Sequence, residues 1–360
     1  MIKFALLFFF CISVLSLKLN AQQFNVSDIQ GIDINGDTCI FPLLSGKNKK
    51  AAQKINTYLQ IAVLSKIGAS ADSIPYSNVF PVEGEYWGGS LYSYHINNND
   101  SKFFSVTISY DYTGAYTERF EQYFNFISAT GEHVLLEDFF AETPLSTIGE
   151  IINQRFANSI ETFMTTIDTL SEDGNEQYAM YEECLKYMKD NTEIYGANFF
   201  IEDSNFVFVK ERCSNHAMAY YDELCMLNEA MSFELLSNFF NQNGSDIYNG
   251  GKWDSKRSSI NEKILNGKIN KKYAITAKFE YNQFENYLEG VYWYDNYKIP
   301  IYLYGELKED GTFVLEIALE KTAEKVISET FTGIIQDGVF KGTWSNANKT
   351  LKFPFLLSIN

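Results

Sequence analysis

The last quarter of the chain alternates short apolar runs with tight turns, and this pattern leaves few possible folds. Two of the turns, Asp310-Gly311 and Asp337-Gly338, carry the Asp-Gly pair that is typical of short β-hairpins. Short connections join antiparallel neighbours, and a meander hides its edge strands best when it closes on itself. We therefore predict an all-β meander barrel or sandwich. Its expected strands are 273–281, 288–294, 299–307, 313–319, 331–335, 339–344 and 351–359.

A polar stretch separates this segment from the rest of the chain. Residues 242–272 contain turn formers such as Gly250-Gly251, many charges and few apolar residues, which is typical of a linker. A chain of 360 residues also exceeds what a single hydrophobic core usually serves. The sequence therefore predicts two domains, 22–241 and 273–360, joined by a linker over 242–272.

The first domain mixes helical and strand periodicities. In some stretches apolar residues recur every three or four positions, and in others they alternate with polar residues. The fold class that this favours is α+β, an antiparallel sheet with packed helices. The expected helices are 47–67, 144–170, 175–190 and 235–240, and the expected strands are 38–41, 91–96, 103–112, 120–126, 198–201, 206–209 and 224–227.

Residues 1–21 have the layout of a secretory signal peptide. Lys3 precedes an uncharged apolar run over 4–17, and Ala21 is a small residue at the expected cleavage site. The run is shorter than the roughly 20 residues that a membrane-spanning helix needs, although an uncleaved anchor is the alternative. We expect an exported protein, periplasmic or secreted after cleavage near Ala21, without a transmembrane span in the mature chain.

The net charge of the chain disfavours some classes of partner. There are 46 acidic and 29 basic residues, a formal net charge of −17. Phosphates would be repelled, so nucleic acid and anionic membrane surfaces are not expected partners. An envelope protein or a glycan is the partner that the sequence leaves open.

Tyrosines gather near the predicted strands of the first domain. Strand alternation predicts that Tyr110, Tyr112 and Tyr94 share one face, and Tyr116 follows the next turn. If exposed, these four would form a ligand-binding surface, stacking on sugar rings or anchoring a protein. If buried, they are the core of a sheet. Both interpretations stay open.

Four cysteines follow the signal peptide: Cys39, Cys184, Cys213 and Cys225. Export permits disulfides. If 206–209 and 224–227 pair as a hairpin, Cys213 and Cys225 come close, so we predict a disulfide between them and leave the other two unpaired. A zinc site made by Cys213, His216 and Cys225 is the alternative, but it lacks a fourth ligand. We predict no metal and no cofactor.

No short motif identifies a chemistry. The signatures of nucleophile elbows, phosphate-binding loops, dinucleotide folds and zinc proteases are all absent from the sequence. Paired carboxylates such as Glu118 and Glu121 are frequent, as on any acidic surface, and a glycosidase would need two of them across one cleft. No catalytic residue is therefore predicted, and a hydrolase of envelope polymers is kept as the alternative function.

The barrel segment contains a short internal repeat of its residue pattern. Leu288-Glu289-Gly290, followed by Trp293, recurs as Phe340-Lys341-Gly342, followed by Trp344. One interpretation is two half-sites of one pocket. The other is that similar hairpins need similar residues, with glycine at a bend and tryptophan in the core.

Residues 30–241 resemble a known pair of extracytoplasmic domains of unknown function, found in RsiV-type anti-sigma factors and PdaC-type peptidoglycan deacetylases. The resemblance is carried by many positions, among them Tyr110-Asp111-Tyr112-Thr113-Gly114-Ala115, Tyr123-Phe124-Asn125-Phe126, Leu135-Leu136-Glu137-Asp138-Phe139-Phe140, Asn198-Phe199-Phe200-Ile201, Phe206-Val207-Phe208 and Met231-Ser232-Phe233-Glu234-Leu235. Relatives often have histidine after Gly-Ala where this chain has Tyr116.

The resemblance implies an α+β module without known catalytic residues that senses or binds components of the cell envelope. In the anti-sigma factor this module binds lysozyme. We expect neither a deacetylase domain nor a cytoplasmic segment, so the resemblance is not expected to extend to deacetylation or signalling. The expected function is a secreted or periplasmic, non-enzymatic binding module with an unknown ligand.

Overall fold

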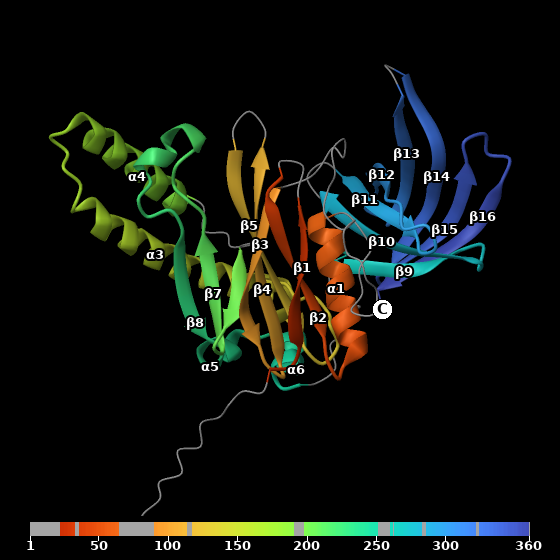
Figure 1. The fold of residues 1–360 in the computed structure, drawn as a ribbon, viewed down its shortest axis with the longest axis horizontal. Coiled ribbons are helices and arrows are strands. Elements are labelled where there is room, and N and C mark those ends of the chain that lie inside the picture. Colours follow the sequence, from red (N-terminus) through yellow and green to blue (C-terminus); the bar gives the residue numbers. More distant parts are fainter. Residues whose placement is uncertain are drawn as a thin grey trace, which may run out of the picture.

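The computed structural model describes residues 22–32, 36–64, 90–113, 117–190, 198–250, 260–261, 263–282, 286–321 and 324–359. The predicted signal peptide, 1–21, lies outside these ranges. Figure 1 shows an α+β region with a pair of helices projecting at one end and a β-barrel at the other. Within the described ranges, no helix is long and apolar enough to cross a lipid bilayer.

The first half of the α+β region is one helix between antiparallel strands. Strands β1 (Asn25–Ile32) and β2 (Thr38–Ser45) pair with each other, and α1 (Lys49–Leu64) follows. Strands β3 (Ser90–Asn99), β4 (Phe103–Thr113) and β5 (Thr117–Ile127) form a second antiparallel sheet in that order. The apolar side of α1, with Ile55 and Leu59, packs into one core with Phe104, Val106 and Ile108 of β4. The three-and-four spacing seen in the sequence is the reason this face is buried.

The second half of the region surrounds a cluster of phenylalanines. Phe139, Phe206 and Phe233 lie at its centre, and the Phe206 and Phe233 ring centroids are 4.3 Å apart. The elements that contribute are α2 (Leu136–Phe139), α3 (Glu142–Met164), α4 (Glu172–Asp190), β6 (Phe199–Glu202), β7 (Asn205–Lys210), the 3-10 turn η1 (His216–Tyr221), β8 (Leu227–Ser232), α5 (Phe233–Leu236), η2 (Ser237–Phe239) and α6 (Gln242–Tyr248).

At the β6 edge of the β6–β7–β8 sheet, backbone groups form hydrogen bonds with side chains instead of with another strand. Strand β6 is an edge strand, and the Ile201 N–H donates to Ser105 Oγ at 3.1 Å and to Asn125 Oδ1 at 3.0 Å. The Asn125 amide in turn donates to the Phe199 carbonyl at 3.0 Å. All of these groups are buried, where an unpaired backbone amide would be costly. Buried polar groups therefore connect the β3–β4–β5 sheet to the β6–β7–β8 sheet.

The barrel is a closed meander of eight antiparallel strands. All seven strands expected from the sequence are present, and the fold class, α+β with a C-terminal β-meander barrel, is confirmed. Buried phenylalanines, including Phe279, Phe313, Phe331, Phe340 and Phe355, fill the interior. The strands are β9 (Lys263–Ile269), β10 (Tyr273–Asn282), β11 (Tyr287–Tyr294), β12 (Ile301–Leu307), β13 (Thr312–Lys321), β14 (Glu324–Gln336), β15 (Val339–Asn346) and β16 (Lys352–Ile359).

The expected linker over 242–272 is wrong at both ends. Its first residues form α6, which packs on α2, and its last residues form β9, the strand that closes the barrel between β10 and β16. Gly267 makes the closure possible, because a Cβ there would lie 1.8 Å from the carbonyl oxygen of Leu356 on β16. Residues 251–259 and 262 lie outside the described ranges.

The barrel contacts the α+β region through an apolar patch and a buried ion pair. Val291 and Trp293, on the outer face of β11, pack against Ile61 of α1. Beside them, Lys263 Nζ lies 3.2 Å from Asp138 Oδ2 and donates to the His133 carbonyl at 2.9 Å. Both charged side chains are at most 3% exposed. A shift of either part would leave a buried charge without its partner.

We predict that Lys263→Met lowers the free energy of unfolding by about 3–5 kcal/mol, because the Asp138 carboxylate would stay buried after losing the ammonium group beside it. Urea unfolding of the whole chain measures the effect. The Lys263→Met/Asp138→Asn double variant should lose less than the sum of its two single variants. Lys189→Ala, which breaks the exposed ion pair to Glu161, is the control and should cost at most about 1 kcal/mol. A Lys263→Met loss as small as the control's would contradict the prediction.

We also predict that β9 is required for the barrel to fold alone. A fragment of residues 260–360 should give a β-sheet circular dichroism spectrum with a cooperative thermal transition. A fragment of residues 273–360 lacks the strand that joins β10 to β16, so two open edges remain and it should aggregate or stay unfolded. Cooperative melting of the shorter fragment would show that closure is not needed.

Candidate functional site

Three of the four tyrosines proposed from the sequence lie on one face of the β3–β4–β5 sheet. Tyr94 is on β3, and Tyr110 and Tyr112 are on β4, opposite Phe120 and Glu118 of β5. Tyr94 and Tyr110 pack at the margin of the core that contains Ile108. Tyr116 lies outside the described residues. Strand alternation therefore placed the described members of this set on a common face.

Stacked rings join the core to the surface along this face. Tyr92 stacks on Tyr110 with centroids 5.6 Å apart, and Tyr110 stacks on Phe120 at 5.9 Å. Tyr112 meets Phe120 edge-on at 6.4 Å. Tyr92 is buried, whereas Tyr112 and Phe120 are 41% and 40% exposed. We call Tyr92, Tyr110, Phe120 and Tyr112 the aromatic ladder. One end of the ladder is therefore buried in the core of the sheet and the other end is exposed.

Tyr94 is tied to the neighbouring sheet instead of to the ladder. Its hydroxyl donates to Asp28 Oδ1 of β1 at 2.5 Å. Burial, together with this hydrogen bond to a carboxylate, raises the pKa of Tyr94, so the hydroxyl stays protonated. Tyr94 therefore cross-links β3 to β1.

Charged side chains flank the exposed end of the ladder. Glu118, opposite Tyr112, forms an ion pair with Arg212 from the segment after β7. On the other face, Arg119 lies 3.4 Å from Asp111 and its guanidinium donates to Ser93 at 3.1 Å. On the face of the ladder, the exposed rings are thus bordered by the carboxylate of Glu118 and the guanidinium of Arg212, which can exchange hydrogen bonds with a polar ligand.

The expected Cys213–Cys225 disulfide is wrong. The structure pairs Cys213 with Cys184 of α4, with Cα atoms 5.4 Å apart. The hairpin argument fails because β8 begins at Leu227, not at 224, so Cys225 precedes the strand. Cys225 is exposed, with a φ of +52°, and Cys39 is buried; neither takes part in the Cys184–Cys213 disulfide. Because Cys213 is oxidised, it supplies no thiolate for the zinc alternative either.

A polar cluster folds the segment around η1 onto α4 and brings the two cysteines together. The Tyr181 hydroxyl, on α4, donates to Asp222 Oδ1 at 2.8 Å, and the Ser214 N–H donates to Asp222 Oδ2 at 2.8 Å. Burial is the main cause that raises the pKa of Tyr181, which keeps it a donor. The loop is therefore anchored one turn of α4 away from Cys184.

We predict that Cys184→Ser lowers the stability of the oxidised chain by roughly 3–4 kcal/mol, from the chain-entropy model for a separation of 29 residues. Thermal unfolding with and without reductant measures the effect. Cys225→Ser is the matched control and should change little. Peptide mapping under non-reducing conditions should recover the Cys184–Cys213 pair; recovery of a Cys213–Cys225 peptide would refute the assignment.

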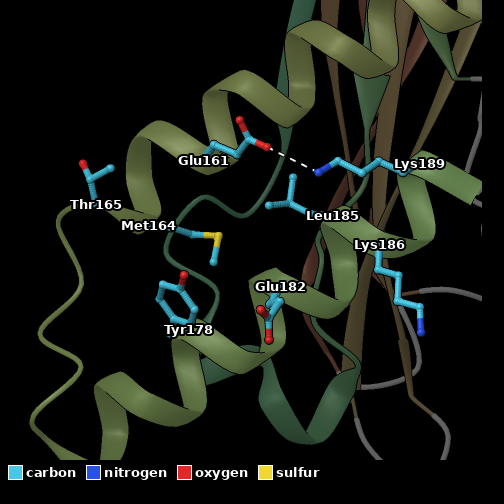
Figure 2. A pocket seen from close by; sticks show the side chains of 8 residues that line it. All are labelled: Glu161, Met164, Thr165, Tyr178, Glu182, Leu185, Lys186 and Lys189. Carbon is cyan, nitrogen blue, oxygen red and sulfur yellow. Dashed lines mark ion pairs between the residues drawn. The ribbon is translucent and has the colours of Figure 1, made fainter.

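A groove lies between α3 and α4, as Figure 2 shows. It encloses about 570 Å³. Met164 and Leu185 give it apolar contacts, and an ion pair of 3.6 Å between Glu161 and Lys189 crosses it. Tyr178 is partly exposed within it. The remaining lining residues are Thr165, Glu182 and Lys186.

A second cleft, of about 520 Å³, lies between the α3–α4 connection and η1. Its carboxylates are Asp168, Asp173 and Glu223. The Tyr221 hydroxyl donates to Asp173 at 3.2 Å, and its hydrogen bond to Glu176 is the first cause that raises the pKa of Tyr221 to about 12. We call this the acidic cleft. Across the described residues, no group of three or more His, Cys, Asp or Glu side chains could hold a metal ion.

Sequence reasoning missed parts of these sites for different reasons. Strand alternation gives the face of Phe120. Its position opposite Tyr110 follows once the β4–β5 register is known. The groove and the acidic cleft depend on how α3, α4 and η1 pack. No pattern along the chain indicates which residues of two helices will face each other across a gap.

The comparisons with known proteins are sparse. No protein-family model and no curated protein matches the chain. One solved structure that resembles it comes from Bacteroides fragilis NCTC 9343, with 11% sequence identity and a TM-score of 0.39 over 64% of this chain and 98% of that one. That protein is a member of the DUF3298 family. A similarity at this level supports no functional argument, and the RsiV/PdaC type of the α+β region stays a prediction.

Proposed function

We propose that this chain is an exported, non-enzymatic binding module that holds a glycan of the cell envelope at the aromatic ladder. The observation that carries the proposal is the pair of exposed rings, Tyr112 and Phe120, fixed in place by the stack behind them. Rings that are already immobile lose little conformational freedom when a ligand binds, so the surface is preorganised.

The size of the exposed aromatic surface favours a sugar over a protein. Two rings that are each about 40% exposed offer on the order of 150–200 Å². A stable protein interface buries about 800 Å² on each partner. One or two sugar rings match the smaller area, because the apolar face of a pyranose stacks on an aromatic ring. The Glu118–Arg212 pair beside Tyr112 can exchange hydrogen bonds with its hydroxyls.

The sequence supports the cellular setting of the proposal. The signal-peptide layout of 1–21 predicts export, and the resemblance of the α+β region implies a module that binds envelope components. The net charge of −17 disfavours nucleic acids and anionic lipids.

Binding to purified, insoluble peptidoglycan tests the proposal. The mature chain should sediment with it, and the Tyr112→Ala/Phe120→Ala double variant should bind at least about tenfold more weakly. Tyr302→Ala is the matched control, because Tyr302 is 49% exposed on the outer surface of the barrel and should leave binding unchanged.

Two results would count against a glycan ligand. One is the absence of sedimentation by the wild-type chain. The other is equal sedimentation of the wild type and the double variant. If the double variant instead loses capture of one defined protein from an envelope extract, the ladder is a protein-binding surface.

A hydrolase of envelope polymers is the second candidate, and the acidic cleft is the feature that favours it. Asp168, Asp173 and Glu223 line one hollow beside Tyr221, and paired carboxylates are the groups that glycosidases use. Incubation of the mature chain with peptidoglycan, followed by mass spectrometry of the soluble fraction, tests it. Release of sugars or peptides that Asp173→Asn abolishes would replace the binding-only function.

A further inference from the structure

One end of the barrel holds a carboxylate inside a ring of aromatic side chains. Glu329 of β14 lies two positions before Phe331, a residue of the barrel interior, so it faces inward too. Tyr292 of β11 and Trp344 of β15 also face inward there. The Tyr292 hydroxyl donates to Glu329 Oε2 at 2.6 Å, and Trp344 Nε1 donates to the same oxygen at 2.7 Å.

This geometry shows which residues correspond in the repeat found at 288–293 and 340–344. Trp293 does not correspond to Trp344, because Trp293 faces outward onto α1 whereas Trp344 faces inward. The inward residue of the first hairpin is Tyr292, two positions after Gly290, as Trp344 is two positions after Gly342. The two hairpins thus direct equivalent donors at one carboxylate.

Among the side chains that the structure describes, Glu329 has no positively charged partner. Both of its donors are neutral, since burial raises the pKa of Tyr292 and an indole N–H does not ionise near neutral pH. Both hydrogen bonds fall on Oε2, and no described side chain donates to Oε1. Partly enclosed charges in proteins are normally paired.

Aromatic rings continue from this carboxylate to the solvent. Tyr294 lies 5.5 Å from Tyr292 and 6.4 Å from both Tyr273 and Tyr297. Tyr273 and Tyr297 are 42% and 74% exposed. Further into the barrel, from Phe331 onward, phenylalanine and aliphatic side chains fill the interior. We call this end of the barrel, around Glu329, Tyr292, Tyr294 and Trp344, the mouth.

We propose that the mouth of the barrel binds the head group of an organic cation, an alkylated ammonium such as choline carries. Glu329 supplies the counter-charge, and the faces of Tyr294 and its neighbours supply cation–π contacts. A metal ion would need several oxygen or nitrogen ligands, whereas one carboxylate among rings suits a soft, weakly hydrated cation. A neutral ligand would leave the carboxylate uncompensated.

Choline and its neutral isostere 3,3-dimethyl-1-butanol test the proposal on the full mature chain. The two probes have the same shape and differ in charge. Calorimetry gives the affinities, and tryptophan fluorescence, to which Trp344 contributes as one of four tryptophans, follows binding. Choline should bind saturably and at least about tenfold more tightly than the isostere, and added salt should weaken it.

Two variants locate the site. Glu329→Gln keeps the shape and an acceptor oxygen but removes the charge, so choline binding should fall at least about tenfold. Glu306→Gln is the control, because Glu306 is an exposed carboxylate on the outer face of β12 and its loss should change nothing. The melting temperature of each variant shows whether it is folded.

Equal affinity for choline and the isostere, or no binding of either, would overturn the proposal. So would full choline binding by a folded Glu329→Gln variant. If that variant does not fold, the comparison of the two probes on the wild type still decides. These results are independent of peptidoglycan binding, which depends on the aromatic ladder in the other domain.

Discussion

The buried ion pair between Lys263 and Asp138, beside the apolar contact of Val291 and Trp293 with Ile61, holds the barrel against the α+β region. Asp138 Oδ2 also accepts the Leu135 N–H at the start of α2, and the His133 carbonyl, which accepts from Lys263, belongs to a residue whose ring stacks on Tyr58 of α1 at 4.4 Å. One ammonium group therefore joins β9, α1 and the segment that leads into α2. Such a pair adds little net stability over apolar packing, but it tolerates no shift, because either partner alone would be a buried charge.

Aromatic side chains pack the cores of both the α+β region and the barrel, and they reach the surface in two places. In the α+β region the inward face of β4 continues past the end of the core and becomes the aromatic ladder, so its exposed rings rest on buried ones. In the barrel the interior is packed to the level of Phe331, and the rings above it surround Glu329. Each proposed site is thus an extension of a rigid core, which keeps the rings oriented without a ligand.

Local patterns predicted the elements well where periodicity was strong. The seven C-terminal strand signals, the helix near 49–64 and the common face of Tyr94, Tyr110 and Tyr112 all follow from alternation or from three-and-four spacing. They failed where an element carries little apolar signal. Strand β9 follows a polar run and contains Gly267 and Lys268, so it looks like linker, yet its neighbours on both sides make it a strand.

The sequence by itself determined the α+β class, the meander of the C-terminal domain and the face on which the tyrosines lie, because each depends on residues close together in the chain. Tertiary structure alone decided the partner of Cys213, the ion pair of Lys263 and the convergence of Tyr292 and Trp344 on Glu329. In each of these the partners are separated by many residues and become neighbours only after helices pack or the barrel closes. Periodicity gives the face of a residue, whereas its partner is set by the register and the packing of whole elements.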